Sequence, residues 1–340
     1  VCYGRMGTCT QPFGTLATCL VDAVNVITGN LDRVGGAMFT TPAIDLGGLA
    51  AALGQKGSFG AFHSRVSGYP EFNGELPVAA LAEEIETPGT GQIRALLLHA
   101  GNPVLSTPQG KRLDEALAGL DFVVAIDIYK NETTRHADLI LPPSFGLEHQ
   151  HYPLIALGLA VHNVAKISPQ LMPPPPGVRH DWEILLALSR ALLRRRGAGS
   201  RAIAALIDGL MAGGPERVWA LAVRLGPHGL RGRGLSWQEL AKSPHNINLK
   251  PLIPQLQTTI TTASGRIQVL PAAIARDIPR LEEHWLERSD DKRRLTLISR
   301  RHLRCNNSWM HNSQRLLKGP NRCTLQIHPA DAAARGIDDG

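Results

Sequence analysis

The sequence is poor in cysteine, in charge and in long apolar runs, and each shortage excludes a class of protein. Only five cysteines occur in 340 residues, and none has the C-x-x-C spacing of zinc or iron–sulfur ligands. Their odd number, in two distant groups, argues against a disulfide framework, so a reducing compartment and a cytoplasmic location are expected. No apolar run reaches the length of a membrane span, and the N-terminus lacks a signal pattern.

Charged residues make up 19% of the chain, yet the formal net charge is +7. An excess of this kind indicates either nucleic acid or an anionic cofactor as a partner. The basic residues are spread out, apart from clusters at 194–196, 231–233 and 292–304. Zinc-finger spacing and an aromatic-basic RNA motif are both lacking in the sequence. We therefore expect an anionic cofactor and no nucleic acid.

Residues 96–142 alternate between apolar runs and polar loops in the order strand, loop, helix, strand, loop, helix, strand. Strands are expected at 96–98 and 123–127, a helix at 111–120, and a last strand that stops at Pro142. Open parallel sheets bind ligands in the loops at the carboxyl ends of their strands. The pattern predicts a ligand-binding α/β domain. It lacks the G-x-G-x-x-G turn of an NAD-type dehydrogenase.

The flanking segments extend this prediction to an α/β protein of Rossmann-like parallel-sheet domains with the beginning of a C-terminal β-barrel domain. Helices are expected at 13–27, 79–85, 181–193 and over most of 201–243, and an extended segment at 154–166. Short apolar runs at 267–270, 295–298 and 324–327 predict the first barrel strands. The expected parts are 1–90 (a Gly-rich cofactor-binding part), 91–245 (a Rossmann-like domain with a helical satellite) and 246–340 (a truncated barrel).

Two polar residues directly after the predicted strands are candidate ligand contacts, each with a structural alternative. The amide of Asn102 in G-N-P can read a purine edge or form a plain turn. The carboxylate of Asp127 can bind a ribose hydroxyl or a guanine N–H, or it can cap a helix. Asp138 is expected to have a structural role, holding its loop through backbone bonds.

Further along the chain, residues 300–311 predict a pyrophosphate and pterin cradle, because guanidinium groups bind phosphate in a bidentate way. Its members are Arg300, Arg301, Asn306, Asn307, Ser308 and His311. The alternative is a solvated basic loop, which the interleaved Asn, Ser and aromatic residues disfavour. Glu148, His149, His151 and His162 lie close in sequence, but their spacing does not place them on one helix face, so no protein-ligated metal is expected. The chain offers no convincing general acid, base or nucleophile.

Five motifs, in register across nearly the whole chain, resemble those of the molybdopterin oxidoreductases of the dimethyl-sulfoxide-reductase type, which include formate dehydrogenases and nitrate reductases. They are V-I-T-G-N-L-D-R-V-G-G (26–36), G-N-P-V-L-S-T-P (101–108), D-I-Y-K-N-E-T-T-R-H-A-D-L-I-L-P (127–142), R-H-D-W-E-I-L (179–185) and R-R-H-L-R-C-N-N-S-W-M-H-N (300–312).

The resemblance implies a bis-molybdopterin guanine dinucleotide cofactor with molybdenum or tungsten, held between Rossmann-like domains and a C-terminal barrel. It implies two-electron redox of a small-molecule substrate, coupled to Fe–S electron transfer and to a possible electron-transfer subunit. Carried over by position, Met6 is expected beside the pterin, Asn102 and Asp127 at one guanosine, His149 and Asp181 at a nucleotide, and Ser299 to Ser308 in the barrel loop around the cofactor.

The sequence also departs from this family. The cysteine cluster of a [4Fe-4S] centre and the Cys, selenocysteine or Ser ligand of the metal do not occur in it; both are expected upstream of Val1, so the chain is interpreted as a C-terminal-half fragment. Thr40-Thr41-Pro42-Ala43 replaces the Arg-Gly-Gln of formate dehydrogenases, which argues against formate as the substrate. The alternative function is a non-catalytic molybdopterin-nucleotide-binding or scaffold subunit.

Overall fold

The computed structural model describes residues 1–52, 54, 57–230, 232–288, 295–300, 302–304, 310, 313–320 and 324–338. Among these residues the largest sheet is parallel, with the strands β3 (Ala95–His99), β4 (Phe122–Ile126) and β5 (Leu139–Ile140) in that order. Helices α5 (Pro103–Ser106) and α6 (Gly110–Leu117) connect β3 to β4. The strand–helix–strand pattern read from the sequence is therefore confirmed, with boundaries shifted by one to three residues.

The N-terminal part begins with α1 (Met6–Cys9) and α2 (Gly14–Ile27). Gly29 ends α2 with φ of +66°, a conformation that glycine adopts without steric cost. The part continues with α3 (Leu46–Ala52) and an antiparallel pair of strands, β1 (Phe59–His63) and β2 (Pro70–Phe72). The buried carboxylate of Glu71 accepts hydrogen bonds from the Ser58 hydroxyl and from the backbone N–H groups of residues 61 and 74, which holds this hairpin together.

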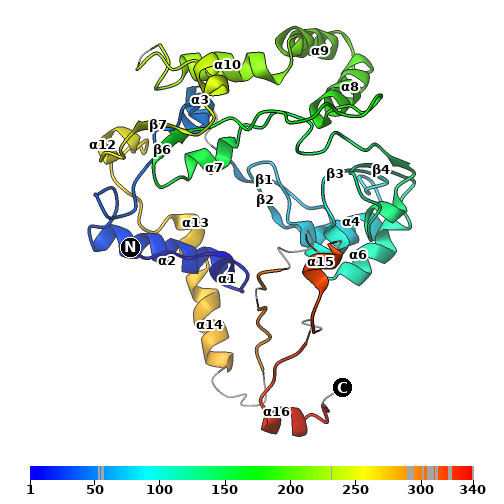
Figure 1. Cartoon of the computed structure of the whole chain (residues 1–340). Helices are drawn as coiled ribbons and strands as arrows, with labels where there is room; N and C mark the ends of the chain where they lie inside the picture. Colours follow the sequence, from blue (N-terminus) through cyan, green and yellow to red (C-terminus); the bar gives the residue numbers. More distant parts are fainter. Residues whose placement is uncertain are drawn as a thin grey trace.

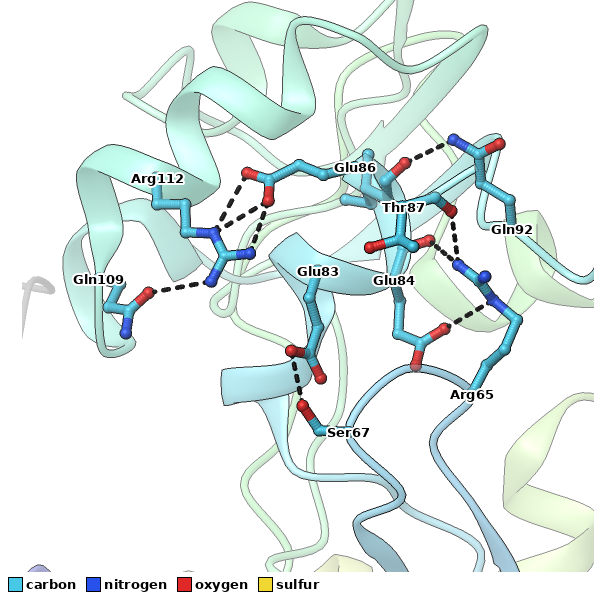
Figure 2. Close-up of polar contacts among 10 residues, drawn as sticks. Arg65, Ser67, Glu83, Glu84, Glu86, Thr87, Gln92, Gln109 and Arg112 are labelled. Carbon is cyan, nitrogen blue, oxygen red and sulfur yellow. Dashed lines mark hydrogen bonds and ion pairs between the residues drawn. The ribbon is translucent and has the colours of Figure 1, made fainter. Parts of the chain in front are cut away.

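Helix α4 (Leu81–Glu86), preceded by the turn η1 (Val78–Ala80), joins the hairpin to the central sheet domain. Its apolar side packs against α6 in a small core of Ala82, Ile85, Leu113, Ala116 and Leu117. Figure 2 shows the polar contacts around it: Nη2 of Arg112 lies 2.7 Å from Oε2 of Glu86, and Nε of Arg65 lies 3.3 Å from Oε2 of Glu84. The helix is thus tied by charge to both neighbours.

A second and larger core lies under the helical layer that follows the sheet. This layer contains α8 (Asp181–Arg194), α9 (Ala198–Met211), α10 (Pro215–Leu225) and α11 (Trp237–Lys242), as expected for 181–193 and 201–243. Tyr152, Val223, Leu235, Trp237 and Leu240 are among its buried residues. The antiparallel strands β6 (Asn163–Ala165) and β7 (Ile247–Lys250) pack into the same core. The other elements are η2 (Thr134–His136), α7 (Leu154–Gly158), α12 (Leu256–Thr259), α13 (Ala272–Ala275), α14 (Ile278–Arg288), α15 (Gln314–Leu317) and α16 (Pro329–Ala333).

The prediction that residues 154–166 are extended is wrong for the first half of this segment. Residues 154–158 form α7, which follows Pro153 and buries Leu157 in the larger core; only 163–165 form a strand. Pro153 is the N-cap of this helix with φ of −79°, within the narrow range that its ring allows, and burial of Leu157 then outweighs the strand tendency of the run.

The three short strands expected at 267–270, 295–298 and 324–327 are also wrong: all of these residues are described, and none is in a strand. The backbone oxygen of Val269 accepts a bond from the Cys19 thiol instead, so this run packs on α2. Residues 295–298 are exposed. A strand needs a partner for its backbone N–H and C=O groups, and the described residues provide none here.

The molecule is open rather than compact. In Figure 1 the helices α8, α9 and α10 lie on one side, and α14 and α16 on the opposite side with the C-terminus. The accessible surface is 23968 Å², against about 13,500 Å² for a compact monomer of this mass. Broad surfaces therefore remain for other groups or chains to cover. In the described part of the chain, no helix is long and apolar enough to cross a membrane.

Candidate functional site: the carboxyl edge of the parallel sheet

The candidate site lies where β3 and β4 end side by side. His99 and Ile126 are register partners in the last rung of this strand pair. Directly beyond it, the backbone N–H of Ala100 donates to the oxygen of Ile126 at 3.0 Å, with φ of Ala100 at +51°. The chain therefore turns sharply at the end of β3. This turn brings the loop after β3 to the same edge as the loop after β4.

Asn102 is held at this edge by the D-I-Y-K-N-E-T motif. Its Nδ2 donates to Oε2 of Glu132 at 2.8 Å, and its Oδ1 accepts from the hydroxyl of Thr133 at 2.6 Å. The same hydroxyl oxygen accepts from the backbone N–H of Val104 at 3.1 Å, and Thr133 is fully buried. Asn102 is therefore more than a plain turn former: its side chain links the two loops. Its oriented amide leaves one N–H of Nδ2 without a partner in the described chain.

Asp127 directly follows β4 and shapes the next loop. Its Oδ1 accepts from the backbone N–H of Tyr129 at 2.9 Å, which closes a local turn. No helix begins at the described residues that directly follow, so Asp127 is not the helix cap that was the structural alternative. Its Oδ2 has no hydrogen bond within the described residues. Asp138 has the structural role expected for it, because its Oδ2 accepts from the backbone N–H of Val123 at 2.7 Å and pins the start of β4.

Asp181 reaches the same edge from the start of α8. Its Oδ1 lies 2.9 Å from Nε2 of His99, and both side chains are partly exposed. The helix begins here because the side chain of Glu183 accepts from the backbone N–H of His180 at 2.8 Å, which satisfies the first turn. Asp181 thus brings a second carboxylate to the end of β3, next to the strand that leads into Asp127.

His149 lies in a separate small group next to this edge. Its Nδ1 is 3.1 Å from the hydroxyl of Ser144, and that hydroxyl is 2.7 Å from Nδ1 of His180. The two imidazole rings meet edge to face with centroids 6.1 Å apart. Ser144 is buried and anchors both rings. Through His180, the residue before Asp181, this group is continuous with the sheet edge.

The structure does not bring all of the expected residues to the edge. Met6 is exposed in α1, which packs against α2. Ser299 and Arg300 are exposed, and neither forms a hydrogen bond or ion pair with the edge within the described part of the chain. The remaining cradle residues, Arg301, Asn306, Asn307, Ser308 and His311, lie outside the described residues.

Sequence reasoning missed five members of the edge: His99, Glu132, Thr133, Ser144 and His180. Glu132, Thr133 and His180 lie inside quoted motifs, so motif membership was an available signal for these three. His99 and Ser144 each lie two residues outside a motif, and only the fold brings them to Asp181 and His180.

The loop that carries Glu132 and Thr133 is held by a charged contact to α6. Asp114 accepts hydrogen bonds from His136, at 2.6 Å, and from Arg135. These two bonds keep the pKa of the Asp114 carboxyl below its usual range. The carboxylate is therefore ionised at neutral pH and fixes the far end of the loop.

Known proteins resemble the chain in two separate stretches. Residues 11–191 match the family model described as molybdopterin oxidoreductase, and residues 295–340 match the molybdopterin dinucleotide binding domain. The sequence is 35% identical over 124 residues to the assimilatory nitrate reductase catalytic subunit of Bacillus subtilis, covering 36% of this chain and 17% of that protein.

Two further relatives are redox subunits. The NADPH-Fe(3+) oxidoreductase subunit alpha of Geobacter sulfurreducens is 26% identical over 205 residues, covering 58% of this chain and 24% of its own length. The F420-dependent formate dehydrogenase subunit alpha of Methanocaldococcus jannaschii is 29% identical over 102 residues, covering 29% of this chain and 14% of its own length. The chain thus spans about a quarter or less of the relatives it matches. The family expected from the five motifs is the one whose models match.

Proposed function

Because the chain belongs to the molybdopterin oxidoreductase family, with a model match over residues 11–191, we propose that it is the nucleotide-binding portion of a molybdenum or tungsten oxidoreductase. The second match, to a molybdopterin dinucleotide binding domain, indicates a molybdenum- or tungsten-pterin cofactor. The finer proposal is a bis-molybdopterin guanine dinucleotide, acting in two-electron redox of a small substrate with Fe–S electron transfer to a partner subunit.

The observation that carries the proposal is the set of polar groups at the carboxyl edge of β3 and β4. A guanine base presents neighbouring N–H donors, which a carboxylate accepts well. Asp127 and Asp181 each have one oxygen without a hydrogen bond in the described chain, and the Asn102 amide, held by Glu132 and Thr133, has one N–H left to donate. These two acceptors and one donor fit the base and ribose of a nucleotide.

These residues would bind and orient the nucleotide rather than react. Asn102 and Asp127 would contact one guanosine, and Asp181 with His149 would line its surroundings. When bound, the pterin-held metal supplies the two-electron redox chemistry, while the protein supplies orientation and electrostatics. Met6, Ser299, Arg300, Arg301, Asn306, Asn307 and Ser308 stay predictions for the pterin and phosphates.

The wider organisation is proposed with it. We place the cofactor-binding part at 1–90, the Rossmann-like domain at 91–245 and the start of a barrel domain at 246–340. A cytoplasmic location and an electron-transfer partner also remain predictions; two of the relatives are named as alpha subunits.

The test compares two carboxylates at opposite ends of β4. Asp127 follows the strand, whereas Asp121 precedes it and pairs with Arg94. We expect Asp127→Ala to lower the guanine nucleotide and the molybdenum or tungsten recovered with the protein from its own cells severalfold, and Asp121→Ala to leave both unchanged. Nucleotide is measured by chromatography after acid release, and metal by mass spectrometry.

Equal nucleotide and metal content in the two variants would contradict the assignment of the edge. Bound nucleotide without redox turnover of an artificial electron donor would instead favour the non-catalytic binding subunit.

A further inference from the structure

The helical layer that follows the sheet carries an excess of positive charge. Residues 190–239 hold nine arginines against three acidic residues, a formal net charge of +6 for this segment. Two of the three acidic residues form ion pairs inside the layer, Asp208 with Arg190 and Glu239 with Arg233, so they do not neutralise the other arginines. The layer therefore presents an unbalanced positive surface.

A cavity of about 640 Å³ opens in this layer between α9, α10, residues 229–230 and residues 234–238, which lead into α11. The buried Leu235 and Trp237 belong to its lining and connect it to the larger core. Leu210 and Leu221 line it and are half exposed. The cavity is therefore an apolar hollow whose floor is part of the larger core. It lies away from the carboxyl edge of the sheet.

Two arginines on α10 line the same cavity. Arg217, Leu221 and Arg224 have the i, i+4, i+7 spacing that puts them on one helix face. Arg217 and Arg224 are about 10 Å apart along the axis. Both are exposed, and neither forms an ion pair within the part of the chain that the structure describes. This face of α10 therefore presents two cationic side chains, one at each end of about two turns, with a leucine between them.

Helix α9 extends the apolar side of the groove. Ile203, Leu206 and Leu210 follow the i, i+3, i+7 spacing, and all three are exposed, Leu206 to 73%. A row of exposed aliphatic side chains beside a hollow is unusual for a surface that faces water alone. In Figure 1, α9 and α10 lie at the outer side of the molecule, where another chain can reach them.

We propose that this groove, formed by the α9 stripe, the α10 face and the cavity between them, binds an acidic amphipathic helix of a partner protein. A helix is the occupant that matches it: leucine-type side chains at i, i+3 and i+7 fill the hollow and cover the α9 stripe. Glutamates on the partner helix, spaced one or two turns apart, reach Arg217 and Arg224. A flat anionic membrane satisfies the charge but does not fill a concave cavity. The proposal does not depend on the cofactor.

The first experiment measures binding of a synthetic acidic helix of about 18 residues, with leucines on one face and glutamates flanking them, to the purified chain. Fluorescence anisotropy at two salt concentrations gives the affinity. The double variant Arg217→Glu with Arg224→Glu is expected to weaken binding about tenfold or more. The matched control reverses Arg196 and Arg201, which are exposed on the same layer outside the cavity lining, and is expected to stay within about twofold.

A charge swap keeps the result independent of folding defects. The same peptide with lysines in place of its glutamates should bind the Arg217→Glu, Arg224→Glu protein better than it binds the unchanged protein. Equal weakening by both double variants would show non-specific attraction and overturn the groove. Absence of acidic-peptide binding, or tighter binding to phosphatidylserine vesicles than to the peptide, would overturn it as well.

Discussion

Tyr152 offers a sharp test of the larger core, because its hydroxyl is buried without a hydrogen-bond partner among the described residues. The ring itself is well packed, with the rings of Trp219 and Trp237 centred 6.2 and 5.9 Å away. Burial raises the pKa of the Tyr152 phenol to about 12. Tyr152→Phe keeps the packing and removes only the unsatisfied oxygen.

Two effects on the free energy of unfolding follow from this. An unsatisfied buried polar group costs about 1–3 kcal/mol, so Tyr152→Phe is expected to raise stability by about 1 kcal/mol at neutral pH. The second effect is on pH dependence. The folded pKa lies above the usual value of about 10, so the unfolded chain loses its proton first as the pH rises. The unchanged protein should therefore lose up to about 2.7 kcal/mol between pH 10 and 12 from this group, and the variant should not.

Urea denaturation followed by tryptophan fluorescence, at pH 7 and across pH 9–12, measures both effects. Tyr129→Phe is the matched control, since Tyr129 is half exposed and should change neither. A variant less stable than the unchanged protein by about 1 kcal/mol or more would show that the hydroxyl has a favourable partner. The description of this core would then be refuted.

Two further predictions concern the central sheet domain. A Cβ atom on Gly110 would lie 2.0 Å from the backbone oxygen of Val104, so Gly110→Ala should cost about 2 kcal/mol or more in urea denaturation; Gly119→Ala, whose Cβ would meet its nearest atom at 3.4 Å, should be tolerated. Asp114→Asn should lower the melting temperature at neutral pH, because the His136 and Arg135 bonds hold the Asp114 pKa low. Such a contribution is present above the usual carboxyl pKa and is lost as pH falls through the folded one, so the two melting curves should converge in acid. A difference that persists at low pH would contradict this.

Much of the central domain could be predicted from the sequence. Strands β3 and β4, helix α6 and the start of α8 at Asp181 were all predicted close to their observed bounds, because each combines a strong apolar period with a turn or cap signal. The weaker predictions were short apolar runs. A run such as 154–158 suits a strand or a helix locally, and packing of Leu157 decides between them.

The candidate site divides in the same way. Asn102, Asp127 and Asp181 could be named from the motifs that contain them, and the structure places all three at one sheet edge. The hydrogen-bond partners of Asn102 could not be named, since Glu132 and Thr133 lie about thirty residues beyond it in the chain. Side-chain hydrogen bonds over such distances depend on strand register, which local sequence does not reveal.

The sequence by itself determined the family, through five motifs in order, and the parallel strand–helix–strand unit, through the periodicity of its apolar residues. Both are local properties that the spacing of side chains expresses directly. Only the tertiary structure decided which polar groups meet: His99 with Asp181, eighty-two residues apart, and Ser144 with His180. It also decided that the arginines of α10 line an apolar hollow. Such contacts arise when separate cores pack, because burial of apolar surface, and not the order of residues along the chain, fixes which surfaces face each other.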